Sequence, residues 1–103
     1  MKSLMMVATI AVAACSPALA TTPMHYSGEK LAAHAKYSIV QARAIALKAR
    51  AGKITDQELE KESGGTGLRY SFDISSKGKT FEVGVDARTG KVLENQAEGP
   101  NPD

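Results

Sequence analysis

Aromatic residues are scarce in this chain, which has no tryptophan and only five phenylalanine and tyrosine residues among 103. Single-stranded nucleic acids are usually bound on stacked aromatic rings. The chain also lacks a strong basic excess, because without Lys2 it carries twelve basic and eleven acidic side chains. Proteins that bind nucleic acids generally need a basic face to neutralise phosphates. Both shortages argue against nucleic acid as a partner.

Long apolar runs are missing as well. The most apolar stretch, Ser3–Ala14, is shorter than the about 20 residues that a membrane-spanning helix needs, so we expect no transmembrane segment. It follows the positive Lys2 and precedes Ala18-Leu19-Ala20, the small-x-small pattern that signal peptidase prefers. We therefore predict that residues 1–20 are a signal peptide cleaved after Ala20, and that the mature protein is periplasmic or secreted.

The single cysteine, Cys15, lies inside this leader. If cleavage follows Ala20, the mature chain can form neither a disulfide nor a thiolate metal site. Val12-Ala13-Ala14-Cys15 also resembles a bacterial lipobox, in which the cysteine becomes a lipidated first residue. We favour cleavage after Ala20, because the apolar run before Cys15 is short and lacks the usual leucine. A lipid anchor at Cys15, on a lipoprotein of the cell envelope, is the alternative.

Residues 21–37 have little apolar content, and we predict that they form a tether. A short helix with Ser27 as its N-cap would have Leu31 as its one large apolar anchor. His25 and His34 both lie in this segment. A metal site would need further ligands at fixed spacing in a rigid frame, so we expect no metal and no other cofactor.

A helix is predicted from Ile39 to Arg50, with Ser38 as N-cap and Gly52 as the stop signal. Alanine dominates this stretch, so its helix propensity is high. One face carries mostly small apolar residues that would let the helix lie close to a sheet. They are Ile39, Ala42, Ile45, Ala46 and Ala49.

Residues 54–62 predict an irregular edge strand, because the apolar Ile54 and Leu59 have opposite parity. Asp56, Glu58 and Glu60 alternate along it, which puts three carboxylates in one row on the same side of the strand. Exposed charge on an edge strand prevents association between sheets. A cation site is the other interpretation of such a row; we favour the solvated edge.

Strict alternation from Leu68 to Ile74 predicts a strand with one apolar face. The glycine-rich residues 63–67 before it are expected to form a flexible turn. They do not fit a phosphate-binding loop, which would need a Lys-Ser/Thr pair and a following helix. A two-residue hairpin loop at Lys77-Gly78 then sets the pairing with the next strand. The predicted pairs are Ile74 with Phe81, Phe72 with Val83, Tyr70 with Val85, and, on the solvent side, Arg69 with Asp86.

The stretch Phe81–Leu93 predicts a second hairpin, in which Val85 faces Val92. The Asp86 carboxylate can accept hydrogen bonds from the turn backbone, and Gly90 can adopt the left-handed conformation. We therefore interpret Asp86, Thr89 and Gly90 as structural turn residues. Beyond the hairpin the alternation of apolar and polar residues fails, because Glu94 has the same parity as Val92. This indicates either a bulge or the end of the strand near Leu93. Residues 97–103 are expected to be a disordered tail.

One main helix packed on a small twisted antiparallel sheet of three to four strands is an α+β fold. The sequence also resembles the PepSY domain, from Ser38 to about Glu94, which is nearly all of the predicted domain at residues 38–96. The resemblance rests on Ser38-Ile39-Val40-Gln41-Ala42-Arg43-Ala44-Ile45-Ala46, Ala51-Gly52-Lys53-Ile54, Tyr70-Ser71-Phe72-Asp73-Ile74 and Glu82-Val83-Gly84-Val85-Asp86-Ala87-Arg88-Thr89-Gly90-Lys91-Val92-Leu93. Gly84 departs from the larger residue that is usual in the family between Val83 and Val85.

The resemblance implies a helix on an antiparallel sheet, as in propeptides of secreted metallopeptidases and in small exported bacterial proteins. It brings no catalytic residues. We therefore expect a binding module, not an enzyme, whose partner is a protein and which modulates or inhibits a peptidase as a separate chain. The alternative is an envelope sensor or accessory domain that binds a small ligand or cation through Asp56, Glu58 and Glu60.

Mass spectrometry of the protein purified from the exporting cell separates the two leader predictions. Cleavage by signal peptidase gives a mature chain that starts at Thr21, with no added mass. A chain that starts at Cys15 with the mass of attached acyl groups would contradict this prediction and establish the lipoprotein alternative.

Overall fold

The computed structural model describes residues 25–99. The predicted signal peptide at residues 1–20, with Ala20 and Cys15, lies outside the described residues, as do the first residues of the predicted tether and the tail residues 100–103.

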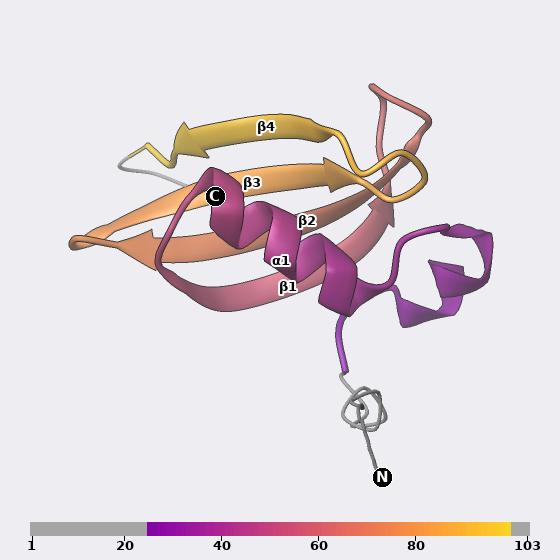
Figure 1. Ribbon diagram of the computed structural model, residues 1–103, viewed down its shortest axis with the longest axis horizontal. Coiled ribbons are helices and arrows are strands. Elements are labelled where there is room, and N and C mark those ends of the chain that lie inside the picture. The colour runs from indigo at the N-terminus through magenta and orange to yellow at the C-terminus, as the bar shows by residue number, and fades with distance from the viewer. Residues whose placement is uncertain (1–24, 100–103) are drawn as a thin grey trace, which may run out of the picture.

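The fold is a four-stranded antiparallel sheet with one helix across one face, which confirms the predicted α+β class (Figure 1). Each strand is hydrogen-bonded to the one that follows it in the chain, so the order across the sheet is β1-β2-β3-β4. The elements are α1 (Ile39–Ala49), β1 (Lys53–Lys61), β2 (Leu68–Ser76), β3 (Lys79–Asp86) and β4 (Val92–Ala97), preceded by the short 3-10 helix η2 (Glu29–His34).

Helix α1 begins at a capping box. The Ser38 hydroxyl accepts from the Gln41 backbone N–H at 3.1 Å, while the Gln41 side chain accepts from the Ser38 N–H at 2.8 Å. These reciprocal bonds satisfy N–H groups that have no partner within the first helical turn. At Gly52, after the helix, an added Cβ would lie 2.4 Å from the Ser75 carbonyl oxygen. Glycine therefore lets the connection from α1 pass directly over the end of β2.

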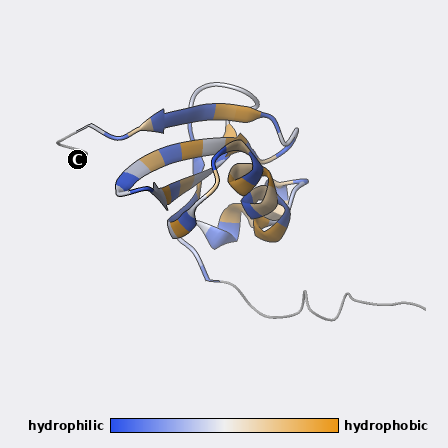
Figure 2. Ribbon diagram, turned by 60° about the vertical axis from the view of Figure 1, so that its left-hand side comes forward, coloured by the Kyte–Doolittle hydropathy of each residue, from blue (hydrophilic) through white to orange (hydrophobic). Residues whose placement is uncertain are grey.

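The predicted register of β2 and β3 is confirmed residue by residue. Ile74 pairs with Phe81, Phe72 with Val83, Tyr70 with Val85, and Arg69 with Asp86. Side chains alternate between the faces of a strand, so this register puts the apolar residues of both strands on the side that α1 covers. Figure 2 shows the resulting alternation of hydrophobic and hydrophilic residues along the strands.

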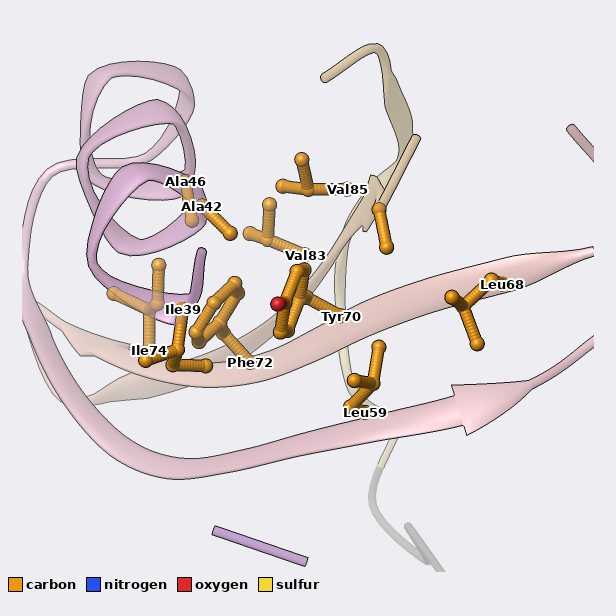
Figure 3. Packing of buried hydrophobic residues seen from close by; sticks show 11 residues of the cluster. Ile39, Ala42, Ala46, Leu59, Leu68, Tyr70, Phe72, Ile74, Val83 and Val85 are labelled. Atoms are coloured by element: carbon orange, nitrogen blue, oxygen red, sulfur yellow. The ribbon is translucent and has the colours of Figure 1, made fainter. Parts of the chain in front are cut away.

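The core lies between this sheet face and α1 (Figure 3). The helix contributes Ala42 and Ala46, which have no exposed surface and bring its axis close to the strands. Ala49, expected on the same face, is exposed, because it lies at the end of the helix. The buried hydrophobic residues are Ile39, Ala42, Ala46, Leu59, Leu68, Tyr70, Phe72, Ile74, Val83, Val85 and Ala87.

The second hairpin pairs Val85 with Val92 as predicted, and a bulge then shifts the register so that Gly84 pairs with Glu94. Of the two alternatives at Leu93, the bulge is therefore the one observed. The strand continues farther than expected, because Ala97, assigned to the tail, is the last residue of β4. The Glu98 N–H extends the ladder by donating to the Thr80 carbonyl at 2.9 Å.

Residues 25–37 pack on the domain, in contrast to the tether predicted for residues 21–37. Four of their side chains lie against the core, whereas the sequence pattern indicated Leu31 alone; they are Tyr26, Leu31, Ala35 and Tyr37. The Ser27 carbonyl accepts from the Leu59 N–H at 2.8 Å, which adds a parallel bridge to the outer edge of β1. The N-cap of η2 is Gly28, not Ser27, and no side chain caps this helix.

Gly28 is a position where this segment approaches β1 tightly. Its φ is +84°, and an added Cβ would lie 1.8 Å from the Leu59 carbonyl oxygen. Gly28→Ala is expected to detach residues 25–28 from β1, which lowers the free energy of unfolding and speeds hydrogen exchange at the Leu59 amide. Denaturant unfolding and hydrogen exchange measure the two effects.

Gly78→Ala is the matched control, because Gly78 has a φ of +80° but open space around it. Both substitutions incur the backbone strain, and Gly28→Ala also loses contacts, so its destabilisation should be larger by at least about 1 kcal/mol. Equal losses in the two variants would contradict a tight contact at Gly28.

Candidate functional site

Asp86 occupies the end of β3 and is only 1% exposed. Its Oδ1 accepts hydrogen bonds from the Arg88 N–H at 2.8 Å and the Thr89 N–H at 3.1 Å. Its backbone carbonyl accepts from Gly90 at 2.9 Å, and the Thr89 hydroxyl accepts from the Lys91 N–H at 3.2 Å. The three residues interpreted as turn residues thus lie together in the β3–β4 turn.

Asp86 also reaches the β1–β2 loop, a contact that sequence reasoning missed. The Thr66 N–H donates to Oδ2 at 2.7 Å and the Thr66 hydroxyl donates to Oδ1 at 2.8 Å. Gly65 lies directly against the same carboxylate, because an added Cβ would be 2.3 Å from Oδ2. The glycine-rich loop, expected to be a flexible turn, is therefore fixed to the opposite hairpin. A threonine between glycines was the only local signal for this contact.

The pKa of Asp86 reports the balance of these interactions. Burial by itself raises the pKa, because it removes water from the carboxylate. The hydrogen bonds from Thr66, Arg88 and Thr89 stabilise the charged form and outweigh burial, so the pKa falls from 3.8 to about 2. Asp86 is thus ionised at neutral pH and stabilises the fold in that form.

The same turn holds the segment that enters α1. The buried Ala87 accepts from the Lys36 and Tyr37 N–H groups at 2.9 and 3.0 Å, and its own N–H donates to the Leu68 carbonyl at 2.9 Å. Gly90 packs under the Tyr37 ring, where an added Cβ would lie 2.7 Å from the ring. The glycine is thus required both by its φ of +77° and by this close approach.

Carboxylates gather on the face of the sheet that α1 does not cover. Asp56, Glu58 and Glu60 project there in the predicted row, because their partners on β2 are Asp73, Ser71 and Arg69. Burial raises the pKa of Glu58, and the charges of Glu60, Asp56 and Asp73 raise it further. The pKa of Glu82 on β3 is also raised, mainly by burial and next by the negative charge of Glu94.

Arg69 is a cation on this face, and it pairs with Glu94. Its Nη1 lies 3.1 Å from the Glu94 carboxylate, and its Nη2 donates to the Ser63 carbonyl at 3.3 Å. The predicted pairing of Arg69 with Asp86 is confirmed in the strand register. Asp86 does not lie on the solvent side, however, because it is buried and its carboxylate binds Thr66 and the turn backbone. Gly84 makes room for Arg69 to cross β3, since an added Cβ would lie 3.0 Å from its Cδ.

Neither histidine side chain is hydrogen-bonded to the carboxylates of the open face or to Asp86. The His25 side chain is 87% exposed and lies 3.6 Å from the Glu29 carboxylate, while the His34 carbonyl accepts from the Arg88 side chain. Within residues 25–99, no group of three or more histidine, cysteine, aspartate or glutamate side chains is arranged to hold a metal ion. The carboxylate row of Asp56, Glu58 and Glu60 on β1 therefore forms no such group.

A model of the PepSY family, described as peptidase propeptide and YPEB domain, matches residues 36–95. The chain belongs to the PepSY family. The match covers α1 and nearly all of the sheet, and it leaves residues 25–35 outside. Comparison with curated proteins and with solved structures found no match.

The two edges of the PepSY sheet differ. On β1, the N-terminal segment is bound at Glu58 and Leu59 through Ser27. On β4, no strand among residues 25–99 is paired with the outer edge. Asn95 on β4 instead reaches α1, where its amide donates to the Ala49 carbonyl at 3.2 Å and accepts from Arg50 at 3.1 Å. Among the described residues, no helix is long and apolar enough to cross a membrane.

Asp86→Asn tests the turn of the PepSY domain. At pH 7 the variant should lose about 2 kcal/mol of unfolding free energy, because an amide cannot accept from all the donors that face the carboxylate. The folded pKa lies below the unfolded value, so the wild type should lose this contribution as the pH falls from about 4 to about 2. Denaturant unfolding across this pH range measures both effects.

Asp56→Asn is the control, since Asp56 is exposed among like charges on β1. Its unfolding free energy at pH 7 should stay within about 0.5 kcal/mol of the wild type. If Asp86→Asn is equally mild, or retains the wild-type acid dependence, the carboxylate does not stabilise the turn.

Proposed function

We propose that this chain is an exported, non-catalytic binding module that binds a peptidase and modulates or inhibits it. The family description, peptidase propeptide and YPEB domain, supports the class of partner. The chain joins the PepSY domain to a predicted signal peptide at residues 1–20, which supports action outside the cytoplasm.

The observation that carries the proposal is the outer edge of β4, with which no strand among residues 25–99 is paired. The Glu98 N–H donates inward to Thr80, and inward and outward N–H groups alternate along an antiparallel strand. The N–H groups of Asn95 and Ala97 therefore point outward, where they are available to an extended segment of a partner. Glu94 is the one charged residue of β4, which has no lysine or proline to block such pairing.

The arrangement of charged groups supports a binding role over catalysis. Among residues 25–99, three carboxylates have shifted pKa values. Asp86 lies in a turn whose N–H and hydroxyl donors occupy both of its oxygens, and Glu58 and Glu82 lie on an open sheet face. General acid–base catalysis places such groups where a substrate can be enclosed. An added strand needs only backbone groups at the edge, which β4 supplies.

Asn95→Pro paired with Asn95→Ala tests the docking edge. Both variants lose the side-chain contacts with α1, but only proline removes the outward N–H. The tagged mature chain captures peptidases from periplasmic extract; each captured peptidase is then purified and assayed with the wild type and both variants. We expect Asn95→Ala to bind and to change peptidase activity, and Asn95→Pro to bind at least about tenfold more weakly.

Two outcomes would contradict the proposal. If no captured peptidase changes its activity in the presence of the wild-type chain, the proposed function is wrong. If both variants act equally, the β4 edge is not the docking site. Circular dichroism of the two variants establishes that the PepSY fold is intact in each.

A further inference from the structure

A hollow of about 260 Å³ lies between η2, the β1–β2 loop and the β3–β4 turn. Leu31 and His34 border it from η2, and Lys61 borders it from the end of β1. Leu68 and Arg88 complete its wall from the start of β2 and from the turn, beside Thr66 and Gly67. Neither the turn chemistry at Asp86 nor the β4 edge makes use of this hollow.

Arg88 is held in place at the wall without being neutralised. Its Nε donates to the His34 carbonyl at 3.1 Å, and its Nη1 donates to the Thr66 carbonyl at 2.9 Å. Both acceptors are neutral, and Nη2 has no partner among residues 25–99. A guanidinium fixed by two carbonyls loses little further freedom when it binds an anion, and its planar donors suit a carboxylate.

Lys61 adds a second positive charge at the hollow. It is exposed and forms no ion pair within the described part of the chain. No acidic side chain is among the residues that line the hollow. Asp86 lies behind Thr66, buried, with both carboxylate oxygens occupied by N–H and hydroxyl donors. The charge that the hollow presents is therefore positive.

The apolar part of the wall indicates which chemical group is attached to the bound anion. Leu68 is almost completely buried, whereas Leu31 packs against the core and stays partly exposed, so Leu31 presents fixed hydrophobic surface to the hollow. The volume is below the range of about 300–1,000 Å³ typical of sites for drug-sized ligands, which suits one amino-acid residue rather than a large ligand. The hollow thus combines two cations with an apolar contact for one side chain.

We propose that this hollow binds the C-terminal carboxylate of a peptide whose last side chain is apolar. Lys61 and Arg88 contact the carboxylate, and the partly exposed Leu31 contacts the side chain. The site lies away from the β4 edge, so it does not depend on the proposed peptidase docking. Peptides with free carboxyl ends are products of peptide-bond hydrolysis, which is the class of reaction that supplies such a ligand.

Nuclear magnetic resonance of the isotope-labelled mature chain tests the proposal. The probe is acetyl-Ala-Ala-Leu with a free carboxylate, and its C-terminal amide and inorganic phosphate are titrated in parallel. We expect saturable shifts of the Gly67, Leu68 and Arg88 amide signals with the free acid, weakened by added salt, and none with the amide. Equal shifts with acid and amide, or no shifts with either up to about 10 mM, would overturn the proposal.

Lys61→Gln and Lys53→Gln form the matched pair of variants. Both lysines are exposed on β1, at opposite ends of the strand, and neither forms an ion pair among the described residues. Lys61→Gln should weaken binding of the free acid by about fivefold, while Lys53→Gln leaves it unchanged. Equal affinity of the two variants would overturn the role of Lys61. Binding of phosphate without the peptide would refute a peptide ligand and indicate a general oxyanion site.

Discussion

The cross-strand register of β2 and β3 is the constraint on which the rest of this PepSY domain depends. The pairs of Phe72 with Val83 and Tyr70 with Val85 place the large apolar side chains on one face. A slip of one residue would turn all of them toward the opposite face. Because Ala42 and Ala46 of α1 are small, the helix packs closely on this face, and the hydrophobic contact offsets the cost of ordering so short a chain.

The same register places Asp86 beside the β1–β2 loop, where it joins segments that are distant in the sequence. Asp86 holds Thr66, and Ala87 binds both Leu68 and the residues before α1. The Asp86 turn, which lies in one of the stretches that carry the PepSY resemblance, is therefore the structural junction of the domain. The outer edge of β4, unpaired among residues 25–99, and the hollow beside Arg88 lie around it.

Charge is separated on a chain whose basic and acidic residues nearly balance. Carboxylates of β1, β2, β3 and β4 share the open sheet face, where their mutual repulsion contributes to the raised pKa values of Glu58 and Glu82. Lys61 and Arg88 lie at the hollow on another part of the surface. The small net charge therefore conceals separate negative and positive areas. In an antiparallel sheet, side chains from different strands that point to the same face lie side by side, so carboxylates far apart in the sequence become neighbours.

The sequence alone determined α1, its cap at Ser38, the β2–β3 register and the turn at Asp86, since these follow from periodicity and from contacts between near neighbours. Tertiary structure decided the packing of residues 25–37, the Asp86–Thr66 contact, the Arg69–Glu94 pair and the charged hollow. Each of these depends on where distant segments meet. Local periodicity carries no information on such distances, and a side chain such as Leu31 or Arg88 acquires its partners only when the sheet has formed.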